Sequence, residues 1–378
     1  MSRVDVCLGD RRYPVLIGEG GRERDLPRLV HRQARRGGRV FVIFDAQVCA
    51  LYGPELVARL ADSGGSIHQM VLPSGERFKT LSVAAAVYDF LLRRRVARDD
   101  FLLAVGGGVT TDLAGYTAAT ILRGIPWGAV PTTLLGMVDA AIGGKTGVNH
   151  PLGKNLIGAF WQPRFVLCDV GFLPTLPDRE LVAGLGEVVK YAGLAGETFL
   201  RLLESYLDGG NLLEARSLSR LVRLSVAYKA GVVVRDERES GPRMALNLGH
   251  TFGHAVEQAA GFGRLRHGEA VLLGLDAAVE LSIAQKPSRR AGLAGYRALV
   301  RRLLGVLPRR RISAEAVMEA LALDKKRAGT TARFVLLDAP GRPLIGTEVP
   351  AAAVRDAVRA MLEHYAPEGG RHVQSPRR

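Results

Sequence analysis

Apolar residues follow two different patterns along the chain. In the first part, short apolar runs alternate with amphipathic segments. The runs cover residues 39–45, 68–72, 101–105, 127–130 and 166–169. Short apolar runs bounded by turn residues are typical of buried strands in a parallel sheet. The segments at 47–63 and 80–96 carry apolar residues at helical spacing. Such alternation of strands and helices predicts an α/β domain with a mostly parallel sheet.

The two ends of this region are also visible in the pattern. Residues 3–17 alternate apolar and polar around Gly9-Asp10, which predicts a hairpin. From Asp178 onward helical patterns dominate, with long helices at 212–235 and 268–286 and a small hairpin at 332–346. We therefore expect one domain at 1–176, a helical domain at 177–365 and a disordered tail at 366–378.

Composition agrees with a two-domain chain. The 378 residues are 47% hydrophobic and 24% charged, enough for two cores. Three scattered cysteines exclude a disulfide framework and fit a reducing compartment. The first residues have no apolar signal core, and no apolar run reaches the roughly 18 residues of a membrane span. We expect a soluble, cytoplasmic protein without membrane contact.

The formal charge of +15 raises the alternative of a basic α/β protein that binds nucleic acid without catalysis. Much of the excess is arginine in short runs at 93–95, 309–311 and 377–378. These runs lack the interleaved aromatics of single-strand binders. We interpret most of this charge as solvated surface, and a smaller part as attraction for a phosphorylated substrate.

Three of the eight histidines lie in the segment 243–269. His250 and His254 are four residues apart, which places both on one helix face, and His267 follows a turn. Two histidines that hold a divalent ion need a third ligand, and the carboxylates available are Glu257, Glu269 and Glu187. Ordinary helix histidines bonded to carbonyls or water are the alternative. Their clustering among glycines favours a metal or acid/base site.

A second group of polar residues follows two of the predicted strands. Residues 106–112, GGGVTTD, form a glycine turn that opens a helix, where backbone N–H groups can meet a phosphate. The spacing differs from GxGxxG, so an ordinary tight turn is the alternative. Further on, a glycine-rich segment with a loose backbone carries Thr132, Thr133, Asp139, Lys145, Lys154 and Asn155. Two lysines and a carboxylate beside a dinucleotide suggest a phosphorylated polyol held for proton and hydride transfer.

Several long strings together resemble the 3-dehydroquinate synthases of the sugar phosphate cyclase superfamily. They are PSGERFK, GGGVTTDLAG, VPTTLLGMVDAAIGGKTGVNHPLGKNLIGAFWQP, GLGEVVKYA, DERESGPRMALNLGHTFGHAVE and HGEAV, in order from about residue 70 to 327. The resemblance implies an α/β fold with an N-terminal Rossmann-like NAD-binding domain and a mostly α-helical C-terminal metal-binding domain. It also implies a substrate, 3-deoxy-D-arabino-heptulosonate 7-phosphate, held between them.

The resemblance assigns roles residue by residue. It implies a zinc or cobalt ion bound by Glu187, His250 and His267. His254 is then an acid/base residue and not a metal ligand. The implied catalytic residues are Lys145, Lys190, Glu239 and His254. The implied substrate contacts are Arg123, Asp139, Lys145, Asn155, Lys229, Arg243, Asn247, Lys325 and Lys326. The implied NAD contacts are Asp45, Ser74, Gly75, Glu76, Arg77, Phe78, Lys79, Gly106, Gly107, Gly108, Val109, Thr110, Thr111, Asp112, Thr132, Thr133, Lys145, Lys154, Phe172, Leu173, Pro174 and Thr175.

The implied reaction gives 3-dehydroquinate and phosphate, as one step of the shikimate pathway. NAD is reduced and regenerated within each turnover. Another cyclase of the superfamily, such as a 2-epi-5-epi-valiolone synthase, is the alternative within the same fold. The implied partners are a small phosphorylated sugar acid and a second copy of the chain, with no nucleic acid and no membrane.

Overall fold

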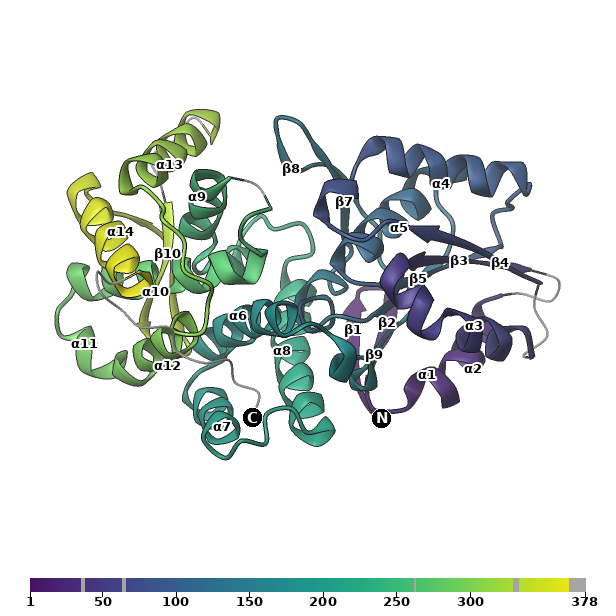
Figure 1. Cartoon of the computed structure of the whole chain (residues 1–378), viewed down its shortest axis with the longest axis horizontal. Helices are drawn as coiled ribbons and strands as arrows, with labels where there is room; N and C mark the ends of the chain where they lie inside the picture. Colours follow the sequence, from purple (N-terminus) through teal and green to yellow (C-terminus); the bar gives the residue numbers. More distant parts are fainter. Residues whose placement is uncertain (35–37, 63–65, 262, 329–332, 367–378) are drawn as a thin grey trace. The chain divides into compact units, whose positions relative to one another are not determined.

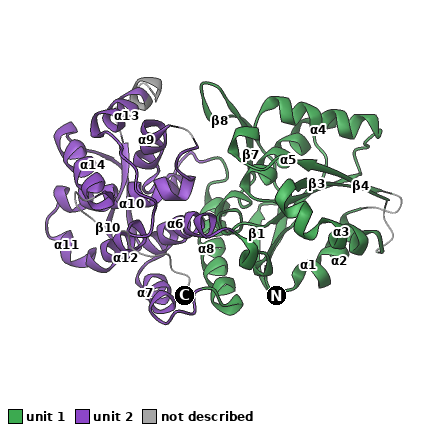
Figure 2. Cartoon of the chain, in the orientation of Figure 1, with its two compact units in different colours: residues 1–176, 213–238 green, residues 177–212, 239–378 purple. Residues whose placement is uncertain are grey.

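The computed structural model describes residues 1–34, 38–62, 66–261, 263–328 and 333–366, except for the side chains of residues 324–328. These residues form two compact units, coloured separately in Figure 2. The first contains residues 1–176 and 213–238, and the second contains residues 177–212 and the chain from 239 onward. Beyond residue 366, the predicted tail lies outside the described residues.

The described part of the first unit is built on a seven-stranded sheet with the order β1-β2-β9-β6-β5-β3-β4 (Figure 1). Its strands are β1 (Ser2–Leu8), β2 (Arg11–Gly18), β3 (Arg39–Asp45), β4 (Ser66–Leu72), β5 (Phe101–Gly106), β6 (Trp127–Pro131) and β9 (Val166–Asp169). The β1–β2 hairpin is antiparallel, and every other pairing is parallel. The predicted α/β fold is confirmed.

Burial follows the apolar runs that predicted these strands. Every residue of β5, β6 and β9 is buried, as expected for central strands covered on both faces. The helices of this unit are α1 (Gly21–Arg24), α2 (Leu26–Gln33), α3 (Ala46–Asp62), α4 (Leu81–Arg93), α5 (Gly108–Thr120) and α8 (Ala215–Arg235). Of these, α5 packs on β5, β6 and β3.

Two features of this unit differ from the sequence prediction. The sequence pattern places residues 213–238 in the second domain, but α8 packs against β1 and β2 and so belongs to the first unit. Helical periodicity shows that a face is buried and does not show which element buries it. In addition, part of the glycine-rich segment forms a hairpin of β7 (Lys145–His150) and β8 (Gly153–Phe160).

The described part of the second unit is mostly helical, as predicted. Its helices are α6 (Asp178–Ala195), α7 (Glu197–Asp208), α9 (His250–Ala260), α10 (His267–Gln285), α11 (Arg289–Gly292), α12 (Ala294–Leu304), α13 (Ala314–Ala328) and α14 (Ala351–Tyr365). The predicted small hairpin is present as β10 (Arg333–Ala339) and β11 (Arg342–Glu348). Among the described residues, no helix has the length and apolar character needed to cross a membrane.

Helix α10 is the centre of this unit and is buried along most of its length. It packs against α6, α9, α12 and α14. Asp276 is a buried carboxylate on α10. It accepts a hydrogen bond from Arg301 Nε of α12 at 3.1 Å and lies 2.6 Å from His364 Nδ1 of α14. Arg301 also reaches Glu280 at 2.7 Å. The guanidinium thus supplies the positive charge that this cluster of acidic groups needs, and it ties three helices together.

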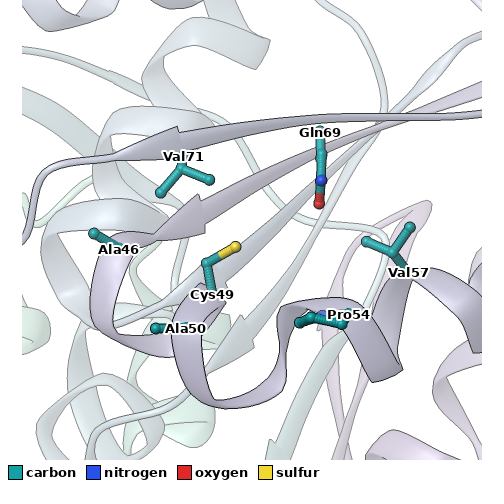
Figure 3. A pocket seen from close by; sticks show the side chains of 7 residues that line it. All are labelled: Ala46, Cys49, Ala50, Pro54, Val57, Gln69 and Val71. Carbon is teal, nitrogen blue, oxygen red and sulfur yellow. The ribbon is translucent and has the colours of Figure 1, made fainter.

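A pocket of 380 Å³ lies in the first unit between α3 and β4 (Figure 3). It is lined by Ala46, Cys49, Ala50, Pro54, Val57, Gln69 and Val71. None of these seven residues carries a charge at neutral pH or belongs to the predicted sites, and burial raises the pKa of the Cys49 thiol. The lining of this pocket therefore offers no charged side chain to an ionic ligand.

Replacing Arg301 with methionine should destabilise the second unit strongly. Asp276 has no exposed surface while Arg301 is 31% exposed, so loss of the guanidinium should cost about 1–3 kcal/mol because His364 is left as the partner of a buried carboxylate. Arg302 provides a matched control, since its pair with Asp208 is exposed and Arg302→Met should cost only about 0–1 kcal/mol. Urea denaturation of the two variants measures both values. Equal losses would contradict a structural role for the Asp276 cluster.

Candidate active site

Three helices of the second unit bring a carboxylate and two imidazoles together. Glu187 lies in α6, His250 is the first residue of α9, and His267 is the first residue of α10. The Nε2 atoms of both histidines lie 3.5 Å from the same oxygen, Glu187 Oε1. One ligand atom from each of the three residues lies within 4.8 Å of the other two.

Glycines allow these helices to approach so closely. A Cβ on Gly268 of α10 would lie 1.7 Å from the carbonyl oxygen of Ala183 in α6. A Cβ on Gly274 would lie 1.9 Å from the carbonyl oxygen of Gly249, at the start of α9. Real Cβ atoms do not come this close to another backbone, so only glycine fits at these crossings. Gly268 directly follows His267, and Gly249 directly precedes His250, which fixes the separation of the two rings.

The surroundings of each ring orient it toward Glu187. His250 Nδ1 lies 3.2 Å from the carbonyl oxygen of Leu248, and His267 Nδ1 lies 3.5 Å from the buried carboxylate of Glu257. With Nδ1 protonated, each histidine presents a lone pair on Nε2. The other oxygen of Glu187 is 2.5 Å from Lys190 Nζ, one helical turn further along α6.

The two histidines differ in their affinity for a proton. Burial, followed by the nearby Lys190 ammonium, lowers the pKa of His250 to about 3, against the effect of Glu187. Burial also acts to lower the pKa of His267, but hydrogen bonds to Glu187 and Glu257 outweigh it and raise this pKa to about 10. A neutral His250 is thus ready to act as a ligand, whereas His267 must lose a proton first.

The geometry of this group fits a divalent metal. Two imidazole nitrogens and one carboxylate oxygen are a donor set typical of catalytic zinc sites. Ligands on a tetrahedral ion with bonds of about 2.1 Å lie about 3.4 Å apart, close to the two separations of 3.5 Å. Glu187 has no exposed surface, so its charge requires cationic neighbours.

His254 belongs to a different arrangement. Its ring is 5.6 Å from that of His250, as expected four residues further along α9. Its nitrogen, however, groups with Glu257 and His267 and not with Glu187. His254 is exposed, unlike Glu187, His250 and His267. Helical spacing therefore predicted correctly that His250 and His254 are neighbours. It did not show which of the two faces the buried carboxylate.

A short 3-10 helix, η5 (Pro242–Asn247), lies just before α9. It carries Arg243, which is 1% exposed, and Asn247, whose Nδ2 donates to Glu239 Oε1 at 3.0 Å. Glu239 has a positive φ of 61°. The other non-glycine residues with positive φ in the described chain are Arg95, Leu122, Arg123 and Asn155. Three of these five are predicted substrate or catalytic residues, and backbone strain of this kind concentrates at functional sites.

In the first unit, the glycine turn and the two threonines predicted for NAD lie together. The turn leads from β5 into the N-terminus of α5. Thr132 N donates to the carbonyl of Gly106 at 3.0 Å, and a Cβ on Gly107 would lie 3.0 Å from Thr133 Cγ2. The first turn of α5 thus offers backbone N–H groups and a positive helix end to an anion.

Other predicted NAD residues lie at the carboxyl ends of two further strands of the same sheet. Asp45 ends β3, and its Oδ1 accepts from Ser74 Oγ at 2.7 Å. Residues 172–175 lie in the 3-10 helix η4 (Val170–Thr175), which follows β9. Tyr52 packs edge-on against Phe172 and its hydroxyl lies 2.9 Å from Thr175 Oγ1. Ligands bind at this edge of open parallel sheets.

Predicted substrate and NAD residues of the first unit form two ionic groups. Lys229 is 6% exposed, and its Nζ donates to both the backbone carbonyl and the carboxylate of Asp139 at 2.7 Å. Lys79 is 4% exposed and bridges Asp112 and Asn155 Oδ1, the latter at 2.6 Å. Lys145 and Arg123 are exposed, and Lys154 is half-buried.

The side chains of Lys325 and Lys326 lie outside the described residues. Three neighbours of the predicted sites were absent from the predicted site residues: Tyr52, Asn149 and Glu257. From the sequence, Glu257 is named only as a possible metal ligand, although its position three residues after His254 predicts that the two side chains lie close together. Asn149 stands inside the string GKTGVNHPLGKN, between Lys145 and Asn155.

Comparison with known proteins agrees with this arrangement. The chain matches the family descriptions "3-dehydroquinate synthase N-terminal" over residues 69–183 and "3-dehydroquinate synthase C-terminal" over residues 184–327. A 3-dehydroquinate synthase from Methylococcus capsulatus is 44% identical over 372 residues, which cover 97% of this chain and 99% of that relative. The chain belongs to the 3-dehydroquinate synthase family.

Solved structures of related cyclases have the same fold. A crystal structure of 2-deoxy-scyllo-inosose synthase, complexed with carbaglucose-6-phosphate, NAD+ and Co2+, gives a TM-score of 0.85 at 26% identity, covering 95% of this chain and all of that one (100%). A 2-epi-5-epi-valiolone synthase from Streptomyces hygroscopicus subsp. jinggangensis, with NAD+ and Zn2+ bound, gives 0.83 at 30% identity, covering 94% and 98%. The family fold therefore extends over nearly the whole chain.

The glycine crossing beside His267 should not tolerate a methyl group. We expect Gly268→Ala to cost about 1–3 kcal/mol, because α6 and α10 must separate or distort to admit the Cβ. Gly292→Ala is the control, since its Cβ would meet no atom within 4 Å. Thermal unfolding of both variants measures the difference. A Gly268→Ala variant as stable as the wild type would show that the helices are not held by this contact.

Proposed function

We propose that the chain is an NAD- and divalent-metal-dependent carbon-oxygen lyase that converts 3-deoxy-D-arabino-heptulosonate 7-phosphate to 3-dehydroquinate and phosphate. The observation that carries this proposal is the match to 3-dehydroquinate synthases at 44% identity over almost the full length of both chains. The reaction combines transient oxidation, phosphate elimination, reduction, ring opening and an intramolecular aldol closure. One flexible substrate must be held through all of these steps.

The residues of the second unit suit the metal-dependent part of this chemistry. Glu187, His250 and His267 would hold the ion. When bound, NAD provides a reversible hydride acceptor, and zinc or cobalt provides a Lewis acid that lowers the pKa of a substrate hydroxyl. Glu239 and His254 are our candidates for moving protons. Lys190 balances the charge of Glu187 and so keeps one carboxylate oxygen directed at the two histidines.

The remaining polar residues would bind the substrate. Arg243 can grip the C1 carboxylate through two parallel hydrogen bonds. Lys229 and Asp139 form a preorganised pair that can donate hydrogen bonds to hydroxyl groups and accept hydrogen bonds from them. Our further candidates for contacts with the phosphate and the ring are Arg123, Lys145, Asn155 and one of Lys325 and Lys326. Most of these side chains are cationic, as a phosphorylated sugar acid requires.

For the cofactor, we propose NAD rather than NADP. The segment 106–112 would receive the pyrophosphate at the N-terminus of α5, supported by Thr132, Thr133 and Lys154. Asp45 would accept hydrogen bonds from ribose hydroxyls, and its charge would repel a 2′-phosphate. Residues 74–79 and 172–175 would complete this binding site.

Assembly and location form a further part of the proposal. We infer a homodimer in the cytoplasm. Three apolar side chains of the β7–β8 hairpin support burial against another chain. They are Leu152, Leu156 and Phe160, which are 67%, 60% and 42% exposed. Sedimentation at micromolar concentration tests the dimer, and a monomer would contradict it.

A steady-state assay with the heptulosonate phosphate, NAD and Zn²⁺ or Co²⁺ tests the proposed function. Release of phosphate with formation of 3-dehydroquinate supports it. Turnover of sedoheptulose 7-phosphate instead would favour a related cyclase. Salt-sensitive retention of duplex DNA without turnover would favour the nucleic-acid alternative.

The proposed metal ligands can be separated from the acid/base residue. We expect Glu187→Gln, His250→Ala and His267→Ala each to lose stoichiometric metal, because each removes one of three protein ligands. His254→Ala should keep the metal and lose turnover. Elemental analysis of the purified variants measures this. A metal-free His254→Ala variant beside a loaded His267→Ala variant would make the ligand set wrong.

The substrate class depends on Arg243. A lysine there keeps the charge and loses the planar fork, so Arg243→Lys should raise KM and lower kcat for the heptulosonate phosphate. A charged hydrogen bond of about 1.5–3 kcal/mol corresponds to roughly ten- to hundredfold in kcat/KM. Arg289→Lys, which alters a pair with Asp338, is the control. If Arg243 only braces the fold, Arg243→Lys will lower thermal stability and leave discrimination between heptulosonate and sedoheptulose 7-phosphate unchanged.

A further inference from the structure

The side chain of Asn149 joins two segments of the first unit that are far apart in the sequence. Its Nδ2 donates to Glu76 Oε1 at 2.7 Å in the 3-10 helix η1 (Glu76–Phe78). Its Oδ1 accepts from the backbone N–H of Asn155 in β8 at 3.0 Å. Its own backbone N–H donates to the carbonyl of Lys79 at 2.8 Å. One residue therefore connects the 76–79 segment to the β7–β8 hairpin.

The backbone of the hairpin is irregular where Asn149 stands. The register between β7 and β8 shifts between Val148 and His150, and Asn149 forms an isolated bridge with Thr80. An irregularity of this kind releases a residue from the regular pairing and turns its groups elsewhere. Asn149 uses that freedom to bond outside the hairpin.

Asn155 is held in a conformation that it would not adopt freely. Its φ is 55°, in the left-handed region, which asparagine tolerates better than most residues. Its backbone N–H is held by Asn149, and its side-chain Oδ1 accepts from Lys79 Nζ at 2.6 Å. Lys79 in turn pairs with Asp112 on α5. The strain at Asn155 is thus supported from both ends by residues linked to η1.

We propose that Asn149 is a positioning residue that fixes Asn155 and the Glu76–Lys79 segment in one arrangement. This inference rests on the proposed function, in which Asn155 contacts substrate and residues 74–79 contact NAD. Asn149 itself need touch neither. If it is lost, Asn155 occupies its binding conformation for a smaller fraction of the time, and apparent affinity falls by that fraction. KM should therefore rise more than kcat falls.

The bond between Asn149 and Glu76 can be reversed to test this role. Asn149→Asp keeps an acceptor for the Asn155 N–H but places a second carboxylate against Glu76. We expect KM for the heptulosonate phosphate and Kd for NAD to rise roughly tenfold, about 1.4 kcal/mol. Glu76→Gln combined with Asn149→Asp restores a donor and an acceptor in the opposite order. The double variant should then match Glu76→Gln alone within about threefold.

A second variant gives a result that does not depend on catalysis. Asn149→Ala removes the acceptor for the Asn155 N–H, so hydrogen exchange at that amide should accelerate roughly tenfold or more. His150→Ala is the matched control, because it removes another side-chain acceptor in the hairpin, for the Leu152 N–H, without touching residues 76–79. It should leave exchange at Asn155, KM and NAD affinity unchanged.

The outcomes separate this inference from the proposed function. A wild type without turnover would refute the proposed function, and exchange at Asn155 would still test the role of Asn149. Unchanged exchange in Asn149→Ala would overturn the inference. So would variants with a lower Tm but an unchanged KM, since these would show a purely structural role. Failure of the double variant to recover, while folded, would overturn the pairing with Glu76.

Discussion

The second unit depends on the burial of one carboxylate. Glu187 has no exposed surface, and removing an ionised carboxylate from water costs several kcal/mol unless opposite charges or hydrogen bonds compensate. Lys190 supplies a charge within the same helix, and His250 and His267 approach from two other helices. Glycine at the helix crossings keeps these groups close. The contacts that pack α6, α9 and α10 together therefore also place two imidazoles beside the buried carboxylate.

The same physical rule, that a buried charge needs a partner, holds in the first unit. Lys229 and Lys79 are almost fully buried, and each bonds to a carboxylate on a different element. Such pairs hold side chains in fixed positions before any ligand arrives, which reduces the entropy lost on binding. The strained backbone at Asn155 follows the same logic, because neighbouring hydrogen bonds compensate for an unfavourable φ.

The histidine segment shows how far spacing alone can be taken. Four residues on a helix place His250 and His254 side by side, and their rings are indeed neighbours. Of these two, His250 faces Glu187 Oε1, because it stands at the first position of α9, directly after the close crossing at Gly249. Resemblance to the family predicts different roles for the two histidines, since it carries information about residues distant in sequence. Periodicity within one helix contains no information about which distant segment a side chain contacts.

The sequence by itself determined most elements of the fold, since apolar runs and helical spacing reflect local burial. Tertiary structure alone decided that α8 packs on the sheet of the first unit and that residues 145–160 form a hairpin. It also decided that Glu257 lies beside His267 and that Asn149 bonds to Glu76. The physical reason is that each of these results depends on a contact between segments distant in the chain. Local patterns record that a side chain needs a partner, and only the folded chain selects which one.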